Sequence, residues 1–250
     1  MRQGVSICIA TYNGAKFIKW QIDSILVQIL SADEIIIVDD CSTDETVSII
    51  ANYGCNNIKL IQNAVNRGHV KSFEIALGLA KNEIILLSDQ DDTWLPERLS
   101  KLINKYMTEC VALVTSNYGQ IDEDDSNIRD PKYRLHEADS GSHLLNIIGL
   151  FFGTRPYYGC AMIMNKKLLD VALPFPKWVE GHDVWLALCA NAMQSNFHFE
   201  QKTLNRRLHS NNLTSRARRP ILKVLLTRYR MFMCLNTILF RLIGNLSKIR

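Results

Sequence analysis

The amino-acid sequence predicts an α/β protein with a doubly wound, mostly parallel sheet flanked by helices and followed by a basic C-terminal helical segment. Through the first 115 residues, short apolar runs alternate with longer amphipathic segments, which is the β-α-β-α order of such a sheet. The apolar runs are rich in Ile and Val and nearly free of polar residues, as is typical of parallel strands covered on both faces. A chain of 250 residues is long enough to bury a large core around this sheet.

The first half of the chain supplies the predicted strands and helices of the sheet. Strands are expected at residues 5–10, 34–39, 58–62, 83–88 and 111–116. Helices are expected near residues 15–28, 43–53, 69–80 and 97–107. Ser42-Thr43-Asp44-Glu45 fits a capping box, and Pro96-Glu97 fits the first turn of a helix.

The second half of the chain is less regular. Residues 117–145 are polar and are expected to form a solvated loop, including the acidic stretch at 122–130. Beyond this loop, the pattern predicts a strand at 159–165, a helix at 182–193, a short strand at 196–202 and the basic segment at 216–250.

Charge is unevenly distributed along the chain. The formal net charge is +4, yet the last 50 residues hold 12 of the 29 basic side chains and no Asp or Glu. The preceding residues therefore carry an excess of acidic groups. An acidic body with a basic end predicts a polyanionic neighbour for that end, either a membrane surface or a nucleic acid.

Cysteine usage and the N-terminus indicate the compartment. The seven cysteines are scattered through apolar stretches without a C-x-x-C pair, which predicts reduced, mostly buried thiols. The first apolar run is too short, and too polar at its end, for a signal peptide or a membrane anchor. A cytoplasmic protein is expected.

Polar residues gather where three of the predicted strands end. The first strand ends in Thr11-Tyr12-Asn13-Gly14, the second in Asp39-Asp40-Cys41-Ser42 and the fourth in Asp89-Gln90-Asp91-Asp92. Each stretch alone also fits an ordinary turn, because Asn-Gly and Asp-Ser are common turn formers. The carboxyl ends of parallel strands face one crevice, where α/β proteins bind ligands, and so the three stretches together predict a binding site.

Three aspartates within four positions repel one another unless a cation lies between them. Mg²⁺ and Mn²⁺ prefer oxygen ligands and are commonly held by one or two carboxylates together with substrate phosphates. Asp89 and Asp91 are therefore predicted to face a divalent metal that clamps a diphosphate, with Asp92 in support.

Several stretches, in this order, give the chain a resemblance to the family-2 glycosyltransferases. These enzymes are inverting, depend on nucleotide sugars and have the glycosyltransferase A-type fold. The matching stretches are VSICIATYNGAKFIKWQIDSILVQ, DEIIIVDDCSTDET, NRGHVKSFEIALGLAKNEIILLSDQDDTWLPERL, GCAMIMNKKLL and GHDVWLALCA. The SDQDDTW and HDVWLAL forms most resemble the rhamnosyltransferase-type branch.

The resemblance implies roles for individual residues on the donor side. Asp91 would be the main metal ligand, and Asp89 would contact the ribose or a metal-bound water. Asp40 would accept a hydrogen bond from the imide N–H of a uracil or thymine base. The residues implied in binding the donor are Ala10, Tyr12, Asp39, Asp40, Asn66, Arg67, Asp89 and Arg207, and His209 is implied in the metal or phosphate shell.

The acceptor side requires a general base and groups that contact a sugar. Asp183, at the start of a predicted helix, resembles the family's base, although Asp is also a common helix cap. Many relatives have a Glu-Asp pair where this chain has His182-Asp183, and Glu180 is the alternative carboxylate. Gly159 and Cys160 resemble the acceptor-side glycine segment. Trp94 and Trp185 are candidates for stacking on sugars, with a core role as the alternative.

The basic segment at 216–250 mixes apolar residues with Arg and Lys at helical spacing. Its longest uncharged run is ten residues, well short of the roughly 20 needed to cross a bilayer. It is expected to lie on an anionic membrane surface, which would place the protein peripherally at the inner face of the membrane. Packing on the catalytic domain is the alternative, and no nucleic acid is expected as a partner.

These observations predict a metal-dependent, inverting glycosyltransferase acting in cell-surface polysaccharide synthesis. Residues 1–215 would form the catalytic domain, with a nucleotide-binding half at 1–115 and an acceptor half at 116–215. It would use Mn²⁺ or Mg²⁺ and a UDP- or dTDP-linked donor to modify a glycan or a lipid-linked acceptor. A non-catalytic nucleotide- or glycan-binding relative is the alternative. A sugar nucleotidyltransferase would be expected to carry a Gly-rich basic loop where this chain has ATYNGAKF.

Overall fold

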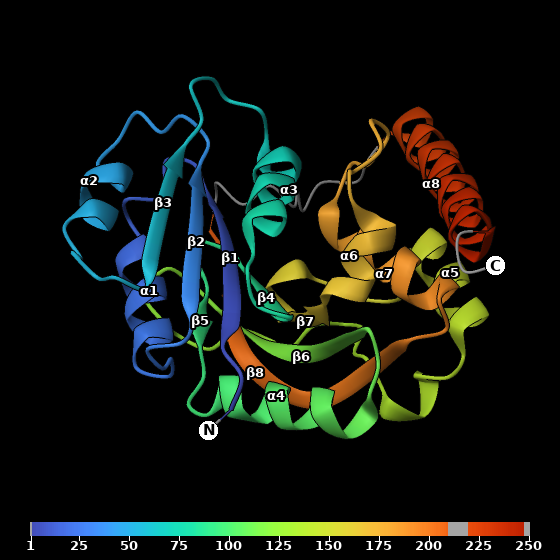
Figure 1. The fold of residues 1–250 in the computed structure, drawn as a ribbon, viewed down its shortest axis with the longest axis horizontal. Coiled ribbons are helices and arrows are strands. Elements are labelled where there is room, and N and C mark those ends of the chain that lie inside the picture. Colours follow the sequence, from blue (N-terminus) through green and yellow to red (C-terminus); the bar gives the residue numbers. More distant parts are fainter. Residues whose placement is uncertain (1, 210–219, 248–250) are drawn as a thin grey trace.

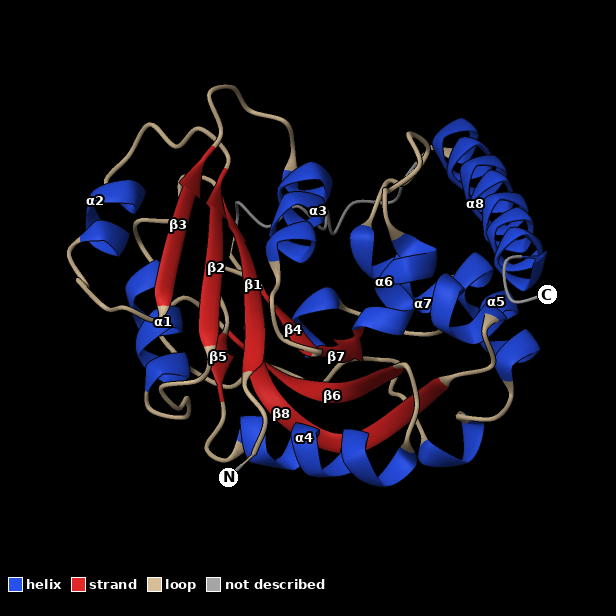
Figure 2. Cartoon of the chain, in the orientation of Figure 1, coloured by secondary structure: helices blue, strands red, loops and turns tan. Residues whose placement is uncertain are grey.

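The structure, a computed structural model, describes residues 2–209 and 220–247. Within these residues, one mixed sheet holds eight strands in the order β3-β2-β1-β4-β7-β6-β8-β5 (Figures 1 and 2). The strands are β1 (Val5–Thr11), β2 (Glu34–Asp39), β3 (Ile58–Gln62), β4 (Ile84–Ser88), β5 (Thr93–Trp94), β6 (Leu113–Ile121), β7 (Met162–Asn165) and β8 (Asn196–Arg207).

The helices lie on both faces of this sheet (Figure 2). They are α1 (Ile18–Leu26), α2 (Thr46–Ala51), α3 (His69–Leu79), α4 (Arg98–Glu109), α5 (His143–Phe152), α6 (Lys166–Ala172), α7 (His182–Ala192) and α8 (Ile221–Ser247). Two short 3₁₀ helices, η1 (Glu137–Asp139) and η2 (Gly159–Ala161), complete the description.

The predicted parallel sheet forms in the first half of the chain. Strand β1 pairs in parallel with β2 and β4, and β2 pairs in parallel with β3. The second half adds a parallel β6–β8 pair, but β7 runs antiparallel to both β4 and β6. The sheet is therefore mixed. The polar stretches follow the carboxyl ends of β1, β2 and β4 in its parallel half.

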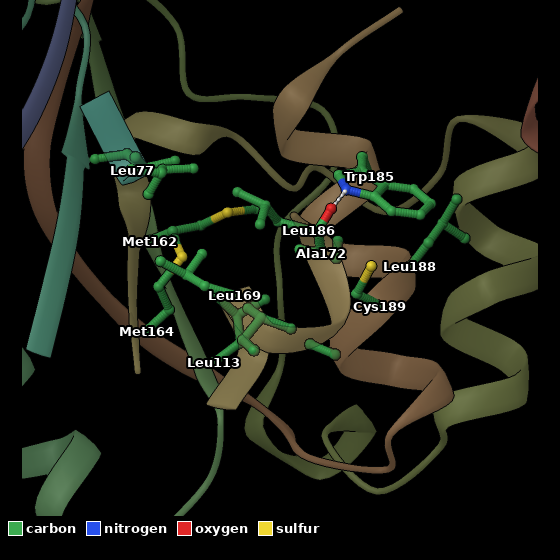
Figure 3. Close-up of a cluster of buried hydrophobic side chains, with 14 of the residues drawn as sticks. Leu77, Leu113, Met162, Met164, Leu169, Ala172, Trp185, Leu186, Leu188 and Cys189 are labelled. Atoms are coloured by element: carbon green, nitrogen blue, oxygen red, sulfur yellow. Dashed lines mark hydrogen bonds between the residues drawn. The ribbon is translucent and has the colours of Figure 1, made fainter. Parts of the chain in front are cut away.

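Apolar residues on both faces of the strands explain the unbroken hydrophobic runs. On β1, Cys8 belongs to a core shared with α3, α6 and α7, whereas Ile7 and Ile9 belong to a second core shared with α1 and α4. Successive side chains of a strand point to opposite faces, so a strand buried on both sides has no polar alternation. Figure 3 shows part of the first core, where Leu77, Met162 and Trp185 come from three different elements.

Two expected features of local structure are corrected. The Ser42–Glu45 stretch is not a capping box: α2 begins at Thr46, and Glu45 makes no side-chain cap. The Ser42 hydroxyl instead bonds Asp39, and the Asp44 carboxylate accepts from Thr46 N at 3.0 Å. The loop expected at 117–145 is shorter, because β6 continues to Ile121 and α5 begins at His143. The polar side chains at the end of β6 are buried beside β8. The polar composition of this stretch therefore wrongly indicated a loop.

Helix α8 packs on α6 and α7 through one face. Met231, Cys234 and Ile238 are buried in the first core, against α7 and α6. Residues 210–219, which include the start of the predicted basic segment and the predicted boundary at 215, lie outside the described residues. Within the described part of the chain, no helix has the length and apolar character to cross a membrane.

Candidate active site

The ends of β1, β2 and β4 are joined by side-chain hydrogen bonds. Gln90 binds the backbone of Tyr12 twice: its Oε1 accepts from Tyr12 N at 2.9 Å, and its Nε2 donates to Tyr12 O at 3.2 Å. Asn13 N donates to Ser42 Oγ at 2.9 Å, and Asn13 Oδ1 accepts from Thr43 N at 2.8 Å. The three polar stretches therefore meet at the carboxyl ends of the parallel strands, which is where α/β proteins bind ligands.

Asp39 and Asp40 are both buried, and both hold the backbone of this edge. Asp39 Oδ2 accepts from Ser42 N at 2.9 Å. Asp40 Oδ1 accepts from Arg67 N at 2.8 Å and from Asn63 Nδ2 at 2.8 Å, while Oδ2 accepts from Gly68 N at 2.7 Å. Asp40 thus fixes the loop between β3 and α3 over the end of β2.

The predicted donor-side residues surround this loop. Asn66 and Arg67 lie exposed on it, and Tyr12 has 46% of its surface exposed. Ala10 is half-buried at the end of β1, beside Val38 of β2. The structure brings these residues to the same edge as the aspartate cluster.

The aspartate cluster forms a turn between β4 and β5, and His209 lies against it. His209 Nε2 is 2.8 Å from Asp91 Oδ2, and the His209 ring stacks near Phe17 with 5.0 Å between ring centroids. A carboxylate is a ligand that Mn²⁺ and Mg²⁺ prefer, and the imidazole, itself a metal-binding group, lies within hydrogen-bond distance of it. Asp91 and His209 therefore fit a divalent metal.

Asp89 and Asp92 form a second, more buried group with Cys160. One ligand atom from each of the three lies within 4.8 Å of the others. Burial, and then the charge of Asp91, raise the pKa of both carboxyl groups, while Arg206 opposes the shift. Asp92 Oδ2 is buried without a hydrogen-bond partner among the described residues. Cys160 thus lies beside the aspartate turn, and these three residues could together hold a metal ion.

The prediction that Arg207 contacts the donor diphosphate is corrected. Its side chain is fully buried, and its guanidinium donates to the carbonyls of Asp91 at 3.1 Å and Asp122 at 2.9 Å. Its Nη2 also pairs with Asp125 at 2.7 Å, and its backbone N–H donates to Asp92 Oδ1 at 3.1 Å. Arg207 holds the aspartate turn to the loop after β6. The neighbouring Arg206, which sequence reasoning missed, is the arginine whose charge acts on Asp89 and Asp92.

Gly159 makes room for a buried histidine. A Cβ at Gly159 would lie 2.3 Å from His182 Nε2. The His182 ring packs on Phe73, with centroids 3.9 Å apart, and meets His69 edge-on at 5.8 Å. Neither ring nitrogen of His182 has a hydrogen-bond partner among the described residues, and burial lowers its pKa to about 3. His182 is therefore neutral at physiological pH.

Asp183 occupies the first turn of α7, directly beside this histidine. Its Oδ1 accepts from Val184 N at 2.7 Å. Burial raises the pKa of Asp183, and the charges of His69 and Arg206 oppose that shift. Asp183 in turn contributes to the raised pKa of Asp89, which places the two carboxyl groups in one electrostatic environment.

Glu180, the alternative base, is engaged elsewhere. Its Oε1 forms an ion pair with Arg230, and its Oε2 accepts from Thr227 Oγ1 at 2.8 Å. Both partners belong to α8. Glu180 thus connects the loop before α7 to α8. Of the two carboxylates, Asp183 is the one whose charge raises the pKa of Asp89 in the aspartate turn.

Trp94 and Trp185 are core residues, so their predicted role in stacking on a sugar is corrected. Trp94 is 3% exposed and donates its Nε1–H to Ser88 Oγ at 3.2 Å, and Trp185 is 1% exposed and donates to Ala172 O at 3.0 Å (Figure 3). An indole buried to this extent presents no open face to a ligand. Trp178, half-buried in the loop before α7, instead lines a cavity together with Asp183.

A cavity of about 950 Å³ lies beside Asp183. Its lining includes His69 of α3, Tyr118 of β6 and Tyr158, together with Arg228, Arg230 and Met231 of α8. Arg206 lies over the Tyr158 ring at 4.4 Å, which links this wall to the aspartate turn. Small-molecule sites commonly have volumes of about 300–1,000 Å³, so this cavity is large enough to hold a substrate.

Solved structures resemble this arrangement. S. aureus TarS 1-349 in complex with UDP-GlcNAc has a TM-score of 0.68 at 20% identity, covering 96% of this chain and 72% of that chain. The mannosyltransferase PcManGT from Pyrobaculum calidifontis, in complex with GDP-Man and Mn²⁺, has a TM-score of 0.61 at 17% identity, covering 97% and 75%. The mixed sheet with its flanking helices is thus the glycosyltransferase A-type fold.

Sequence comparison identifies the family. The model of Glycosyl transferase family 2 matches residues 6–172, more than half of the chain. The chain therefore belongs to glycosyl transferase family 2. The resemblance to this family is thereby confirmed, and the rhamnosyltransferase-like branch stays a prediction.

Named relatives are similar over parts of their length. An uncharacterised glycosyltransferase of Nostoc sp. is 33% identical over 127 residues, which are 50% of this chain and 39% of the relative. The UDP-Glc:alpha-D-GlcNAc-diphosphoundecaprenol beta-1,3-glucosyltransferase WfaP of Escherichia coli is 39% identical over 46% of this chain and 45% of the relative. WfgD of Escherichia coli, which carries the same activity name, is 28% identical over 74% and 69%. The chain spans less than half the length of the first two relatives.

Proposed function

We propose that this chain is a metal-dependent, inverting transferase that moves a sugar from a UDP- or dTDP-linked donor to a hydroxyl of a lipid-linked glycan. The observation that carries the proposal is the position of Asp183, which lines a substrate-sized cavity and acts electrostatically on the aspartate turn. The relatives WfaP and WfgD are named for acceptors carried on diphosphoundecaprenol, which supports the lipid-linked acceptor. The TarS complex supports a uridine donor.

The proposed reaction is a single displacement at the anomeric carbon. Asp183 takes the proton of the acceptor hydroxyl while the oxygen forms the new glycosidic bond on the face opposite the diphosphate. The bond from the anomeric carbon to the diphosphate breaks, and its electron pair leaves with the nucleoside diphosphate. Asp91 and His209 would hold Mn²⁺ or Mg²⁺, which supplies positive charge for the departing diphosphate.

Nucleotide binding tests the donor side. UDP, dTDP and GDP are titrated by calorimetry into wild type and Asp91→Asn, each with and without Mn²⁺. We expect UDP or dTDP to bind only with metal, and Asp91→Asn to lose that binding. Asp124→Asn, which changes an exposed carboxylate in the loop after β6, is the matched control. Nucleotide binding that depends neither on Mn²⁺ nor on Asp91 would contradict the proposed role of Asp91 in holding the metal and the diphosphate.

Helix α8 supplies the proposed contact with an anionic membrane. Its outward face exposes apolar side chains at helical spacing, among them Leu225 at 60%, Tyr229 at 60%, Phe232 at 55% and Phe240 at 80%. Described residues 220–244 include basic side chains and no acidic ones. An apolar face with a basic flank is the pattern of helices that lie in the membrane interface.

Vesicle sedimentation tests this contact. We expect wild type to sediment with phosphatidylglycerol vesicles and to remain in the supernatant with phosphatidylcholine. Leu225→Gln/Phe232→Gln should weaken sedimentation at least tenfold, whereas Val27→Gln, an exposed apolar residue after α1, should not. Equal sedimentation of both variants would contradict a role for α8.

A further inference from the structure

The cavity beside Asp183 adjoins a second groove. This adjoining groove, of about 560 Å³, lies between the 132–136 segment and α5. Lys132, Tyr133 and Arg155 line both spaces. The two spaces thus share part of their lining, between the cavity that Asp183 lines and the groove that α5 lines.

Two exposed basic side chains on the cavity wall, Arg129 and Lys132, form no ion pair with any of the described residues. Arg129 lines the cavity, is exposed and forms no hydrogen bond or ion pair with any of the described residues. Lys132 is also exposed, and its ammonium lies 4.9 Å from the ring of the adjacent Tyr133. Asp130, which lies between them in sequence, is engaged by Arg134 and by Lys202 at 2.5 Å.

Arg155 adds a third cation with a fixed position. It pairs with Asp139 at 2.7 Å, and its side chain is 19% exposed. The aliphatic part of Arg155 approaches Gly149 of α5 so closely that a Cβ there would lie 2.4 Å from Cγ. The guanidinium is therefore held in place where the cavity and the groove share their lining. Arginine forks bind phosphate oxygens in pairs, so these three cations fit a diphosphate.

The far wall of the groove is apolar and open. Helix α5 exposes Leu144 by 71%, Leu145 by 60%, Ile148 by 42% and Phe152 by 76%. Leu145, Ile148 and Phe152 share one helical face and line the groove. Helix α5 has no acidic or basic residue after His143, and Figure 1 places it at the same end of the molecule as α8.

We propose that this groove binds the lipid diphosphate of the acceptor. The diphosphate lies against Arg129, Lys132 and Arg155, and the first isoprene units lie on the apolar face of α5. The acceptor sugar then extends into the cavity toward Asp183. The inference rests on the proposed lipid-linked acceptor, and it names the part of the chain that recognises the carrier rather than the sugar. A neutral glycan would form no ion pair with the three cations, and an inorganic anion would make no contact with the apolar wall.

Binding of farnesyl diphosphate tests the inference without the donor. Titrations are done in EDTA, so that the metal-dependent donor site does not contribute, and at concentrations below the onset of micelles. We expect wild type to bind farnesyl diphosphate at least tenfold more tightly than inorganic pyrophosphate or farnesol. Equal affinity for pyrophosphate would mean that the apolar wall is not used. Equal affinity for farnesol would mean that the cations are not used, and either result would overturn the proposal.

Matched variants separate the two halves of the groove. Arg129→Ala/Lys132→Ala should weaken farnesyl diphosphate at least tenfold, and Lys59→Ala/Lys167→Ala, two exposed lysines that line neither space, should not. Leu145→Gln/Phe152→Gln should weaken farnesyl diphosphate and leave pyrophosphate unchanged. Met107→Gln, an exposed apolar residue of α4, is its control. Unchanged binding in the arginine-lysine variant would overturn the proposal.

A phospholipid ligand and a donor-site variant complete the experiment. Dioctanoyl phosphatidylglycerol should bind at least tenfold more weakly than farnesyl diphosphate, since comparable binding would mean that the groove recognises a membrane headgroup and would overturn the proposal. Asp91→Asn should bind farnesyl diphosphate as wild type does. If Asp91→Asn loses nucleotide binding while wild type fails to bind farnesyl diphosphate, the proposed function stands and this inference fails.

Discussion

Gly159 lies so close to the His182 ring that even a methyl side chain at position 159 would clash with it. A Cβ on Gly159 would be 2.3 Å from His182 Nε2, and Gly159 has no positive φ that would itself demand glycine. The glycine is therefore needed for space. The histidine it accommodates precedes Asp183, so the two residues together set the position of the proposed base.

Gly159→Ala should destabilise the protein by about 1–3 kcal/mol, because the methyl group overpacks a buried ring. His182→Ala on its own leaves a cavity, but combined with Gly159→Ala it removes the clash. We expect the double variant to be more stable than the sum of the two single changes, as measured by denaturant unfolding. Gly78→Ala is the control, since nothing lies within 4 Å of its Cβ and the position is helical. Additive effects at 159 and 182 would show that the two sites do not meet.

His182 should also make the fold sensitive to acid. Burial holds its pKa at about 3 in the folded protein, below the ordinary value of about 6.5 in the unfolded chain. The unfolded chain therefore binds the proton first as the pH falls below 6.5, and stability should fall by about 1.4 kcal/mol per pH unit from this residue. His198, whose pKa burial lowers to about 4, adds a second contribution over the pH range down to 4.

The matched variant is His182→Leu, which loses no hydrogen bond because neither ring nitrogen has a partner among the described residues. Unfolding free energies between pH 7 and pH 4 should decline less steeply in His182→Leu than in wild type. Parallel slopes for wild type and His182→Leu would contradict a neutral, buried His182.

Asp183→Asn should abolish most of the transfer without affecting donor binding. Loss of a general base typically lowers the rate by about 10²–10⁴. Glu180→Gln should retain activity within a few fold, because the Glu180 carboxylate is held by Arg230 and Thr227 of α8. Initial rates with a UDP- or dTDP-sugar, together with nucleotide titrations, distinguish these outcomes. A larger loss in Glu180→Gln than in Asp183→Asn would reassign the base.

The pH dependence of transfer should follow from the same carboxyl group. Burial raises the pKa of Asp183, and a base must be deprotonated to accept a proton. Activity is therefore expected to fall on the acid side at a higher pH than an exposed aspartate would give. A rate–pH profile for kcat/KM measures this limb. A profile that stays flat down to pH 4 would exclude a raised Asp183 pKa as the controlling ionisation.

Local patterns in the sequence predicted the parallel strands and the meeting of three strand ends, since apolar runs and turn residues determine both. They did not predict which polar groups face the ligand. Arg207 and Trp94 are residue types that bind phosphates and sugars, yet packing places one guanidinium on backbone carbonyls and one indole in the core. Arg206 differs from Arg207 by one position in the same strand, and only the pairing of β8 decides which side each faces. The α5 groove joins segments whose individual patterns carry no signal of a site.

Arg207→Met separates the sequence-based role of Arg207 from the structural one. The buried guanidinium donates to Asp91 O and Asp122 O, so its loss leaves carbonyls unsatisfied and should cost about 2–4 kcal/mol of stability. Metal-dependent nucleotide binding should weaken as well, because the aspartate turn loses the hydrogen bond from Arg207 to Asp91 O. Arg134→Met, at an exposed arginine paired with Asp130, should cost less than about 1 kcal/mol and leave binding intact. If Arg207→Met instead keeps full stability and Mn²⁺ affinity while losing affinity for UDP, then Arg207 contacts the donor diphosphate directly, and the structural assignment is wrong.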